Sequence, residues 1–210
     1  MKEIWRYPVK SMGGEPMERA TITPMGIAGD RVVQVVNPQG RMVTARTHGR
    51  LLGHHATTGA DGSVLVDGRP WTDPTVLSDV QQIAGPGARL VRDETAYYRF
   101  DVLPLLVATD GTITAFGKDG RRLRPNIVIG GVEGLAERAW PGRRLRIGDV
   151  VIDVDSLRGR CVMTTYDPDT VQQDLSVLKD IVKRFDGELA LNCAVATPGT
   201  IQVGQSVELF

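Results

Sequence analysis

Glycine and proline recur so often along this chain that long helices are largely excluded. The 210 residues contain 24 glycines and 12 prolines, which are spread evenly and cut the chain into short segments. Glycine weakens the interior of a helix and proline breaks it. Many of the remaining segments are rich in β-branched and aromatic residues, as strands are. Many short strands with few helices predict a mainly β, barrel-like fold.

Two hairpins are expected from their turns. Residues 32–36 and 41–45 are strand-like and are joined by an Asn-Pro-Gln-Gly turn. Residues 64–66 and 69–71 are joined by Asp-Gly, a dipeptide that favours the two-residue turn of a hairpin. Further strands are expected over residues 4–7, 20–23, 189–196, 200–203 and 206–209.

Two segments have the spacing of an amphipathic helix. The first has apolar residues at helical intervals over residues 76–83 and stops at Gly85-Pro86-Gly87. The second ends at Asp186-Gly187, and Asp174 lies where a carboxylate favours a helix N-terminus. The apolar stripe of this second helix consists of Leu175, Leu178, Ile181, Val182 and Phe185.

The charge balance and the termini restrict the class of protein. The chain has 25 basic and 25 acidic residues and a pI near 6.8, so no global field attracts nucleic acid, and nucleic-acid binding is disfavoured. No apolar stretch is long enough to span a membrane, and the first 20 residues carry charges. We therefore expect a cytoplasmic chain without a membrane segment. It divides into two strand-rich units, residues 1–95 and 96–210, which no low-complexity linker separates.

The two cysteines differ in their neighbours. Cys161 follows Arg158-Gly159-Arg160, and nearby positive charge favours the thiolate, which is a soft ligand for a thiophilic metal. The alternative for Cys161 is an ordinary buried cysteine on a strand. Cys193 has apolar neighbours and is expected to pack in the core. Two cysteines and three histidines cannot complete an iron–sulfur cluster or a four-cysteine zinc site.

Basic and amide side chains stand near the ends of several expected strands. Lys10 and Ser11 belong to a loop marked by proline and glycine, which suits a phosphate or a carboxylate. Comparable places are occupied by Arg31, Arg46, Arg124 and Asn126. A guanidinium can hold a phosphate with two hydrogen bonds, and an amide can pair with the edge of a pterin ring. For each arginine taken singly, the alternative is a solvated surface charge.

Together these segments resemble the MOSC family, which is named after the C-terminal region of molybdenum cofactor sulfurases. The N-terminal β-barrel unit of that family is similar to Tyr7-Pro8-Val9-Lys10-Ser11, Gly29-Asp30-Arg31 and Val43-Thr44-Ala45-Arg46. The MOSC domain itself is similar to Arg124-Pro125-Asn126, Arg160-Cys161 and Asp167-Pro168-Asp169-Thr170. The resemblance implies a MOSC β-barrel fold over residues 96–210, packed with an N-terminal β-rich unit over residues 1–95.

The chain is most similar to the amidoxime-reducing branch of the family, whose members reduce N-hydroxylated compounds with an unmodified molybdenum cofactor. The resemblance implies that Cys161 binds molybdenum and that Asp101, in an Asp-x-x-Pro segment, lies near the metal and acts in catalysis. It assigns cofactor binding to Lys10, Ser11, Arg31, Arg46, Arg124, Asn126, Arg160 and Asn192. At the level of the whole family it also implies pyridoxal phosphate binding.

These roles predict an oxidoreductase in which the molybdenum cofactor removes oxygen from an N-hydroxylated small molecule as water, with protons from water or from Asp101. The chain has two cysteines and no recognisable flavin motif, so electrons are expected from a separate reductase or ferredoxin. The alternative is a binding module that carries the cofactor, or a sulfur atom as a persulfide on Cys161, without turnover of its own.

Two departures from the family pattern bear on the substrate entrance. Relatives tend to show Phe-Gly before the asparagine strand, whereas this chain has Glu188-Leu189-Ala190-Leu191-Asn192-Cys193. The segment after Asp101 is short at Ala108-Thr109-Asp110-Gly111, where relatives have a longer helix. Both changes are expected to reshape the entrance.

Overall fold

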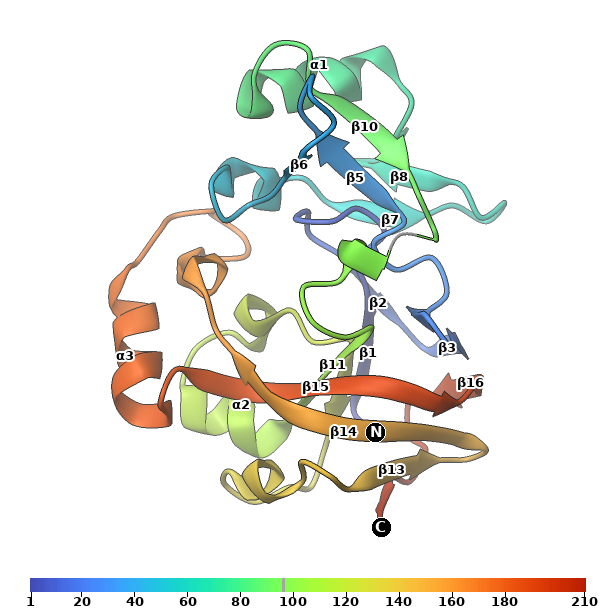
Figure 1. The fold of residues 1–210 in the computed structure, drawn as a ribbon, viewed down its shortest axis with the longest axis vertical. Coiled ribbons are helices and arrows are strands. Elements are labelled where there is room, and N and C mark those ends of the chain that lie inside the picture. The colour runs from blue at the N-terminus through green and yellow to red at the C-terminus, as the bar shows by residue number, and fades with distance from the viewer. Residues whose placement is uncertain (96) are drawn as a thin grey trace.

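The fold is mainly β, as a computed structural model that describes residues 1–95 and 97–210 shows (Figure 1). The strands are β1 (Glu3–Arg6), β2 (Glu15–Met17), β3 (Arg19–Thr23), β4 (Gly26–Ile27), β5 (Val33–Val36), β6 (Met42–Val43), β7 (Ala56–Thr58), β8 (Val64–Val66), β9 (Arg69–Pro70), β10 (Arg89–Arg92), β11 (Leu105–Thr109), β12 (Ile127–Ile129), β13 (Arg144–Ile147), β14 (Val150–Gly159), β15 (Glu188–Thr197), β16 (Gly199–Gln202) and β17 (Glu208–Leu209). The α-helices are α1 (Pro74–Ala84), α2 (Asp110–Phe116) and α3 (Ser176–Phe185). The 3-10 helices are η1 (Gly49–Gly53), η2 (Tyr97–Arg99), η3 (Gly120–Leu123), η4 (Ala136–Ala139) and η5 (Val162–Thr165).

The largest sheet has eight strands in the order β17-β13-β14-β15-β11-β12-β1-β2. It is mixed, because β11 and β12 run parallel while β14 and β15 are antiparallel. Figure 1 shows β14 and β15 side by side across the lower half of the molecule, with α1, β5, β8 and β10 in the upper half. Three further sheets have three strands each. In the part of the chain that the structure describes, no sheet closes into a barrel, so the barrel-like part of the expected fold is not borne out.

Strands from the first and last parts of the chain are paired with each other. β1 lies between β2 and β12, with Ile4 opposite Ile127. β3 pairs with β16. Residues from both parts also share one hydrophobic core, in which Ile4, Ile22 and Ile27 are almost completely buried beside the residues of β11 to β15. A second core lies under the upper sheets and includes Val33, Val66 and Val80. The division into units at residue 95 remains a prediction.

The two expected hairpins are confirmed. β5 pairs with β6 across the Asn-Pro-Gln-Gly turn, whose last residue, Gly40, has a φ of 76°. β8 pairs with β9 with Val66 opposite Arg69. The two turn residues between them, Asp67 and Gly68, have φ values of 50° and 77°, as a two-residue hairpin turn requires.

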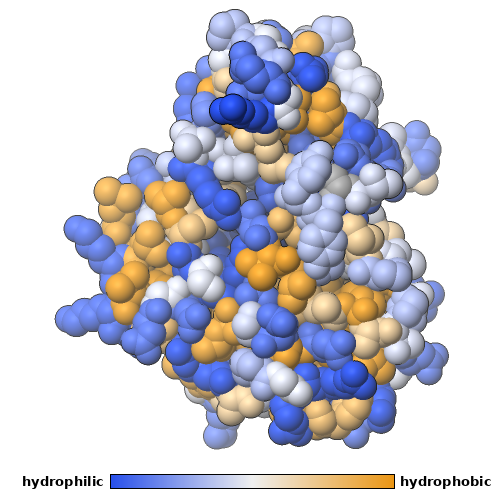
Figure 2. All heavy atoms as spheres, viewed as in Figure 1, coloured by the Kyte–Doolittle hydropathy of each residue, from blue (hydrophilic) through white to orange (hydrophobic). Residues whose placement is uncertain are grey.

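The first expected helix is confirmed and the second only in its position. α1 begins after Asp73, whose carboxylate accepts a hydrogen bond from the Thr75 amide, and it ends at Gly85. α3 ends at Asp186 as expected. Its predicted stripe was partly wrong, because Leu175 and Val182 are more than half exposed, whereas Val177 takes a core position. Hydrophobic side chains accordingly gather on the surface over α3, at the left of Figure 2.

α2 was missed by the sequence reasoning. It is a short helix that begins immediately after the buried strand β11. The side chain of Thr109 accepts a hydrogen bond from the Thr112 amide and so caps the N-terminus. Gly117 ends the helix in the left-handed conformation. These two capping residues are the signals that could have revealed the helix.

Candidate functional site

A basic pocket, here called the thiol pocket, opens where the two parts of the chain meet. It has about 630 Å3 of empty space, counting its open mouth. Its walls consist of Lys10, Ser11, Arg31, Thr44, Arg46, Asp101, Leu106, Arg122, Leu123, Arg124, Arg158, Gly159, Arg160, Cys161 and Met163. A smaller recess shares Arg31, Asp101 and Arg158 with it and adds Asn126 and Asn192. The ten residues singled out from the sequence therefore all line these two neighbouring cavities.

Cys161 and Cys193 differ as the sequence suggested. Cys161 follows β14 and caps η5, and its carbonyl accepts hydrogen bonds from the Thr164 amide at 3.0 Å and hydroxyl at 2.8 Å. It is half-buried with a free thiol that lines the pocket. Cys193 is 0% exposed in the core, where burial raises the pKa of its thiol. The interpretation as an ordinary core cysteine therefore fits Cys193, and Cys161 is the sulfur available to a ligand.

Asp101 is the centre of an ion-pair cluster at the pocket. One oxygen lies 2.9 Å from the Lys10 ammonium and 3.0 Å from the Arg46 guanidinium, and the other lies 3.0 Å from Arg158. Burial alone would raise the pKa of this carboxyl, but Lys10 and then the two arginines hold it well below its usual range. Asp101 is therefore ionised near neutral pH. An ionised carboxylate held by three cations is a poor proton donor, so the geometry does not fit the proton-source role expected for Asp101.

Arg46 links this cluster to the cysteine. Burial alone would lower its pKa, but Asp101, and after it the nearby Cys161 sulfur, raise the pKa above its ordinary value. Arg46 thus forms an ion pair with the Asp101 carboxylate and lies close to the Cys161 sulfur. This arrangement brings the predicted metal ligand and the predicted catalytic carboxylate to one side of the thiol pocket.

Tyr7 supports two of the predicted cofactor-binding arginines. The guanidinium carbon of Arg31 lies 5.2 Å and that of Arg124 lies 4.3 Å from the centre of its ring. Burial, opposed by these arginines, raises the pKa of Tyr7 to about 12, so the phenol stays neutral. Arg31 also pairs with the fully buried Asp30, which accepts a hydrogen bond from the Tyr7 amide at 2.8 Å.

Three of the seven non-glycine residues with positive φ in the described chain line the pocket. Ser11, Arg31 and Arg124 have φ values of 71°, 54° and 55°, which place them in the left-handed region that residues with side chains seldom adopt. All three are predicted cofactor-binding residues that line the thiol pocket. Such strain persists only where the surroundings enforce it, and it is characteristic of ligand sites.

Arg160 has buried donors without a partner. One terminal nitrogen donates to the Leu123 carbonyl at 2.7 Å. Its Nε and its other terminal nitrogen are buried and form no hydrogen bond with the residues that the structure describes. Burial lowers the pKa of Arg160, and also that of Arg124, to about 10. Unsatisfied buried donors on a cation are costly, and an anion bound in the pocket beside Arg160 would offset part of that cost.

The two asparagines are engaged within the protein. The Asn126 amide donates to the Trp5 carbonyl at 3.3 Å, and its oxygen accepts from the Leu106 amide at 3.2 Å. The Asn192 oxygen accepts from Arg158 at 3.1 Å, while its nitrogen donates to the Ser156 hydroxyl and the Leu157 carbonyl. Both amides therefore hold strands and arginines in place, which differs from the direct contact with a pterin edge expected for Asn126.

Two arginines that shape the pocket were not among the predicted cofactor-binding residues. Arg158 bridges Asp101 and Asn192. It precedes Arg160 by two positions on an extended segment, where alternate residues share a face, and this spacing could have revealed it. Arg122 lies on η3 and donates to the Thr165 carbonyl at 3.0 Å and to the Asp167 carboxylate at 3.0 Å. Nothing in the sequence around Arg122 indicates these contacts, because they join distant segments.

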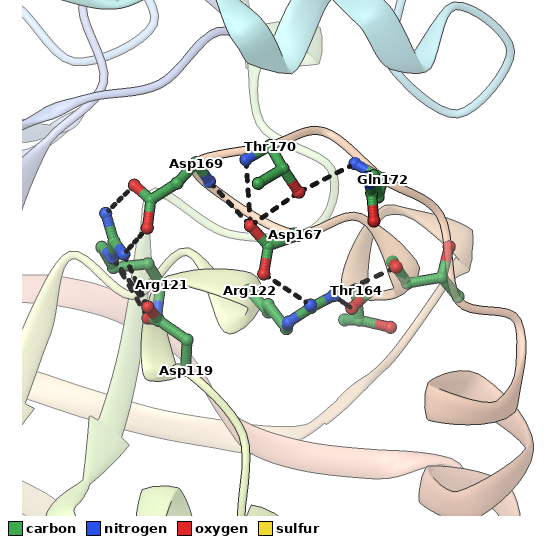
Figure 3. A network of polar contacts seen from close by, with 9 residues as sticks. Asp119, Arg121, Arg122, Thr164, Asp167, Asp169, Thr170 and Gln172 are labelled. Atoms are coloured by element: carbon green, nitrogen blue, oxygen red, sulfur yellow. Dashed lines mark hydrogen bonds and ion pairs between the residues drawn. The ribbon is translucent and has the colours of Figure 1, made fainter.

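The loop that follows Cys161 is held by an ion-pair network (Figure 3). Asp167 accepts hydrogen bonds from the amides of Asp169 and Thr170, which makes a tight turn, and its other oxygen pairs with Arg122. Arg121 lies between Asp119 and Asp169, at 2.6 and 2.7 Å. The Asp-Pro-Asp-Thr motif therefore fixes η5, and with it the position of Cys161, against η3.

The protein side chains alone do not make a metal centre. Among residues 1–95 and 97–210, no group of three His, Cys, Asp or Glu side chains could hold a metal ion. A metal bound to Cys161 would therefore take most of its ligands from an organic cofactor. The described residues fit such a group, because a soft thiol lies beside unsatisfied buried donors of a cation.

Comparison with known proteins gives two family matches and several relatives. Residues 1–93 match the MOSC N-terminal beta barrel domain, and residues 113–208 match the MOSC domain. Mitochondrial amidoxime-reducing component 1 of Homo sapiens is 27% identical over 280 alignment positions, covering 99% of this chain and 82% of that protein. Mitochondrial amidoxime reducing component 2 of Homo sapiens is 28% identical over 244 positions, covering 87% and 71%.

A solved structure agrees in fold. The YUAD protein from Bacillus subtilis superposes with a TM-score of 0.54 at 13% identity, covering 99% of this chain and 93% of that chain. Over the described residues, no helix is long and apolar enough to cross a membrane. Nothing in these matches supports pyridoxal phosphate binding or a cytoplasmic location, and both human relatives carry the word mitochondrial in their names. With its two domain matches, in order, covering most of its length, the chain belongs to the MOSC family.

Proposed function

We propose that this chain binds a molybdenum cofactor in the thiol pocket and reduces N-hydroxylated compounds of the amidoxime type. The observation that carries the proposal is the meeting of the free Cys161 thiol and the unsatisfied buried donors of Arg160 in one basic pocket. The names of the human relatives, which state that they reduce amidoximes, support the choice of substrate.

Each group in the pocket has a role in this proposal. Cys161 ligates the metal through its sulfur. Arg160 neutralises the phosphate of the cofactor, and Lys10, Ser11, Arg31, Arg46 and Arg124 line the same site. When bound, the cofactor supplies two-electron redox chemistry at its metal. Asn126 and Asn192 position strands and arginines instead of contacting the cofactor.

Asp101 has a positioning and electrostatic role in this proposal. Its carboxylate holds Lys10, Arg46 and Arg158 at 2.9 to 3.0 Å, which prevents these like charges from separating. Reduction of an amidoxime to an amidine breaks the N–O bond and consumes two electrons and two protons, and the oxygen leaves as water. The protons come from solvent, and the electrons come from a separate reduced protein, a reductase or a ferredoxin.

Metal analysis of the purified chain tests the proposal. The wild type, Cys161→Ser and Cys193→Ala are produced in a host that makes the cofactor, and their molybdenum content is measured beside benzamidoxime reduction with a chemical reductant. We expect metal and turnover in the wild type and in Cys193→Ala, and loss of both in Cys161→Ser. Molybdenum in Cys161→Ser at the wild-type level would contradict the assignment of the ligand.

The carrier hypothesis makes a different prediction for the same sulfur. A sulfur carrier would show an added sulfur atom on Cys161 by mass spectrometry. Bound cofactor with no reduction of benzamidoxime above that of free cofactor would favour a cofactor carrier over the enzyme.

A further inference from the structure

A second cavity, here called the aromatic pocket, adjoins the thiol pocket. It has about 510 Å3 of empty space, counting its opening. Its walls consist of Trp5, Tyr7, Gly13, Gly14, Leu52, His55, Arg121, Arg122, Arg124, Met163, Tyr166 and Pro168. Arg122, Arg124 and Met163 also line the thiol pocket, so the two cavities share one wall. Met163 is two residues from Cys161, which brings this wall close to the predicted metal ligand.

Rings and apolar side chains give the aromatic pocket its character. Trp5, Tyr7 and Tyr166 line it with aromatic rings, and Leu52 and Met163 add apolar surface. Two glycines leave the space that the tyrosine rings occupy. A Cβ at Gly14 would lie 2.5 Å from the Tyr7 ring, and a Cβ at Gly49 would lie 2.2 Å from the Tyr166 ring. The surroundings thus suit a flat apolar ring.

The charge at the pocket comes from one arginine. Figure 3 shows that Arg121 is paired with Asp119 and Asp169. Arg122 is likewise paired with Asp167 at 3.0 Å. The guanidinium of Arg124 forms no hydrogen bond or ion pair with the residues that the structure describes, and lies over the Tyr7 ring. The aromatic pocket therefore carries an uncompensated positive charge on the wall that faces the thiol pocket.

We propose that the aromatic pocket binds the flat ring of an aromatic N-hydroxylated substrate and presents its N–O group to the thiol pocket, an inference that rests on the proposed function. The charge of Arg124 adds a second selection. An amidoxime is neutral and is accepted, whereas the amidine formed by reduction is a strong base that carries a positive charge and is repelled. The pocket thus favours the substrate over its product.

Binding of three compounds to the full chain, in the absence of any reductant, tests this inference. They are benzamidoxime, acetamidoxime, which lacks the ring, and benzamidine, which carries the positive charge. By calorimetric titration we expect benzamidoxime to bind at least ten-fold more tightly than either of the others. Equal affinity for benzamidoxime and acetamidoxime would overturn the ring pocket, and equal affinity for benzamidoxime and benzamidine would overturn the charge selection.

A matched pair of variants locates the ring. His55 lies on the exposed rim of the pocket, and His55→Trp fills the opening with an indole. His48→Trp places the same indole outside the lining. We expect His55→Trp to weaken benzamidoxime binding at least ten-fold and His48→Trp to leave it unchanged. Unchanged binding to a His55→Trp variant with a wild-type melting temperature would place the ring elsewhere. If that variant does not fold, Tyr166→Leu removes one ring from the wall and is expected to weaken benzamidoxime binding. Unchanged binding to a folded Tyr166→Leu variant would likewise place the ring elsewhere.

Turnover separates this inference from the proposed function. Reduction of benzamidoxime and acetamidoxime with the same KM would overturn the aromatic pocket and leave the proposed function in place. Ring-selective binding that His55→Trp abolishes, in a molybdenum-loaded chain that reduces no amidoxime, would uphold the pocket as a ring site and overturn the proposed function.

Discussion

At the scale of single residues, the thiol pocket collects more positive charge than its carboxylate can neutralise. Seven basic side chains line it together with Asp101. Burial lowers the pKa of Arg124 and of Arg160 to about 10, which measures how much the surroundings disfavour the two charges. The buried positive charges lower the stability of the folded chain and raise its affinity for an anion.

Replacing Arg160 should therefore stabilise the chain when no anion is bound. Arg160→Met removes a buried charge and two unsatisfied donors, which outweigh the lost hydrogen bond to the Leu123 carbonyl, and we expect the free energy of unfolding to rise by about 1 kcal/mol in urea titrations. Added inorganic phosphate should raise the melting temperature of the wild type more than that of the variant. Arg19→Met, at an exposed site, serves as the control. A large loss of stability in Arg160→Met would contradict the argument.

The ion pairs of Asp101 should make stability depend on pH. Its pKa in the folded chain lies well below the unfolded value near 3.9, so its stabilising contribution is fully present above about pH 4 and is lost as pH falls further. We expect Asp101→Asn to lower the free energy of unfolding by about 2 kcal/mol at pH 7 and by less at pH 3. Urea unfolding at both pH values measures this, with the exposed Asp149→Asn as control. A difference that is the same at both pH values would refute it.

At this scale the sequence predicted which residues belong to the candidate site but not which side chains they contact. Cys161 and Arg160 could be predicted because their motif resembles a family. That Asp101 is held by three cations, or that Asn126 bonds to Trp5 instead of facing the cavity, depends on distances between remote segments. Residue types alone do not contain those distances.

At the scale of elements, hairpins and helix ends were predictable because their signals are local. The Asp-Gly turn and the caps of α1 lie within a few residues of the structure they specify. Which residues of α3 are buried was less predictable. Val177 and Val182 have the same side chain, and contacts with neighbouring elements decide that Val177 is buried and Val182 is exposed. The same holds for η3 and η5, which are held by contacts between them.

Removal of Arg122 should loosen η5. Its guanidinium donates to the Thr165 carbonyl and pairs with Asp167, so Arg122→Ala leaves these groups without their partner. We expect hydrogen exchange of the amides of residues 162–174 to become roughly ten-fold faster, since one lost buried hydrogen bond costs about 1 to 3 kcal/mol. Arg121→Ala removes more exposed ion pairs of the same network and should change exchange by less than about two-fold. Equal effects of the two variants would show that Arg122 has no special role.

At the scale of the whole molecule, strands from residues 1–95 and from residues 96–210 pair within the same sheets. β1 completes the eight-stranded sheet and β16 completes the sheet of β3. The thiol pocket takes Lys10 and Arg31 from one part and Asp101, Arg124 and Cys161 from the other. The expected barrel-like units could not anticipate this exchange of strands, because pairing between distant strands leaves no local signal.

Fragments divided at residue 95 should not fold alone. Residues 96–210 without β1 expose the edge of β12 and lose Ile4, Ile22 and Ile27 from a shared core. Each lost isoleucine lowers the free energy of unfolding by about 2 to 5 kcal/mol, and the three losses together are comparable to the whole stability of a typical domain. We expect no cooperative thermal transition for residues 1–95 or 96–210 by circular dichroism. A melting temperature for residues 96–210 within about 5 °C of that of the full chain would show an independent domain.

The place of β1 also determines when the site can exist. Ile4 is made early in synthesis but lies opposite Ile127, so the strand that leads into Tyr7 and Lys10 must wait for a partner made far later. Long-range pairing of this kind is slow. Cys161 is made later still than Ile127, so the basic side chains and the cysteine come together only late in synthesis, and a cofactor can be inserted stably only after translation is essentially complete.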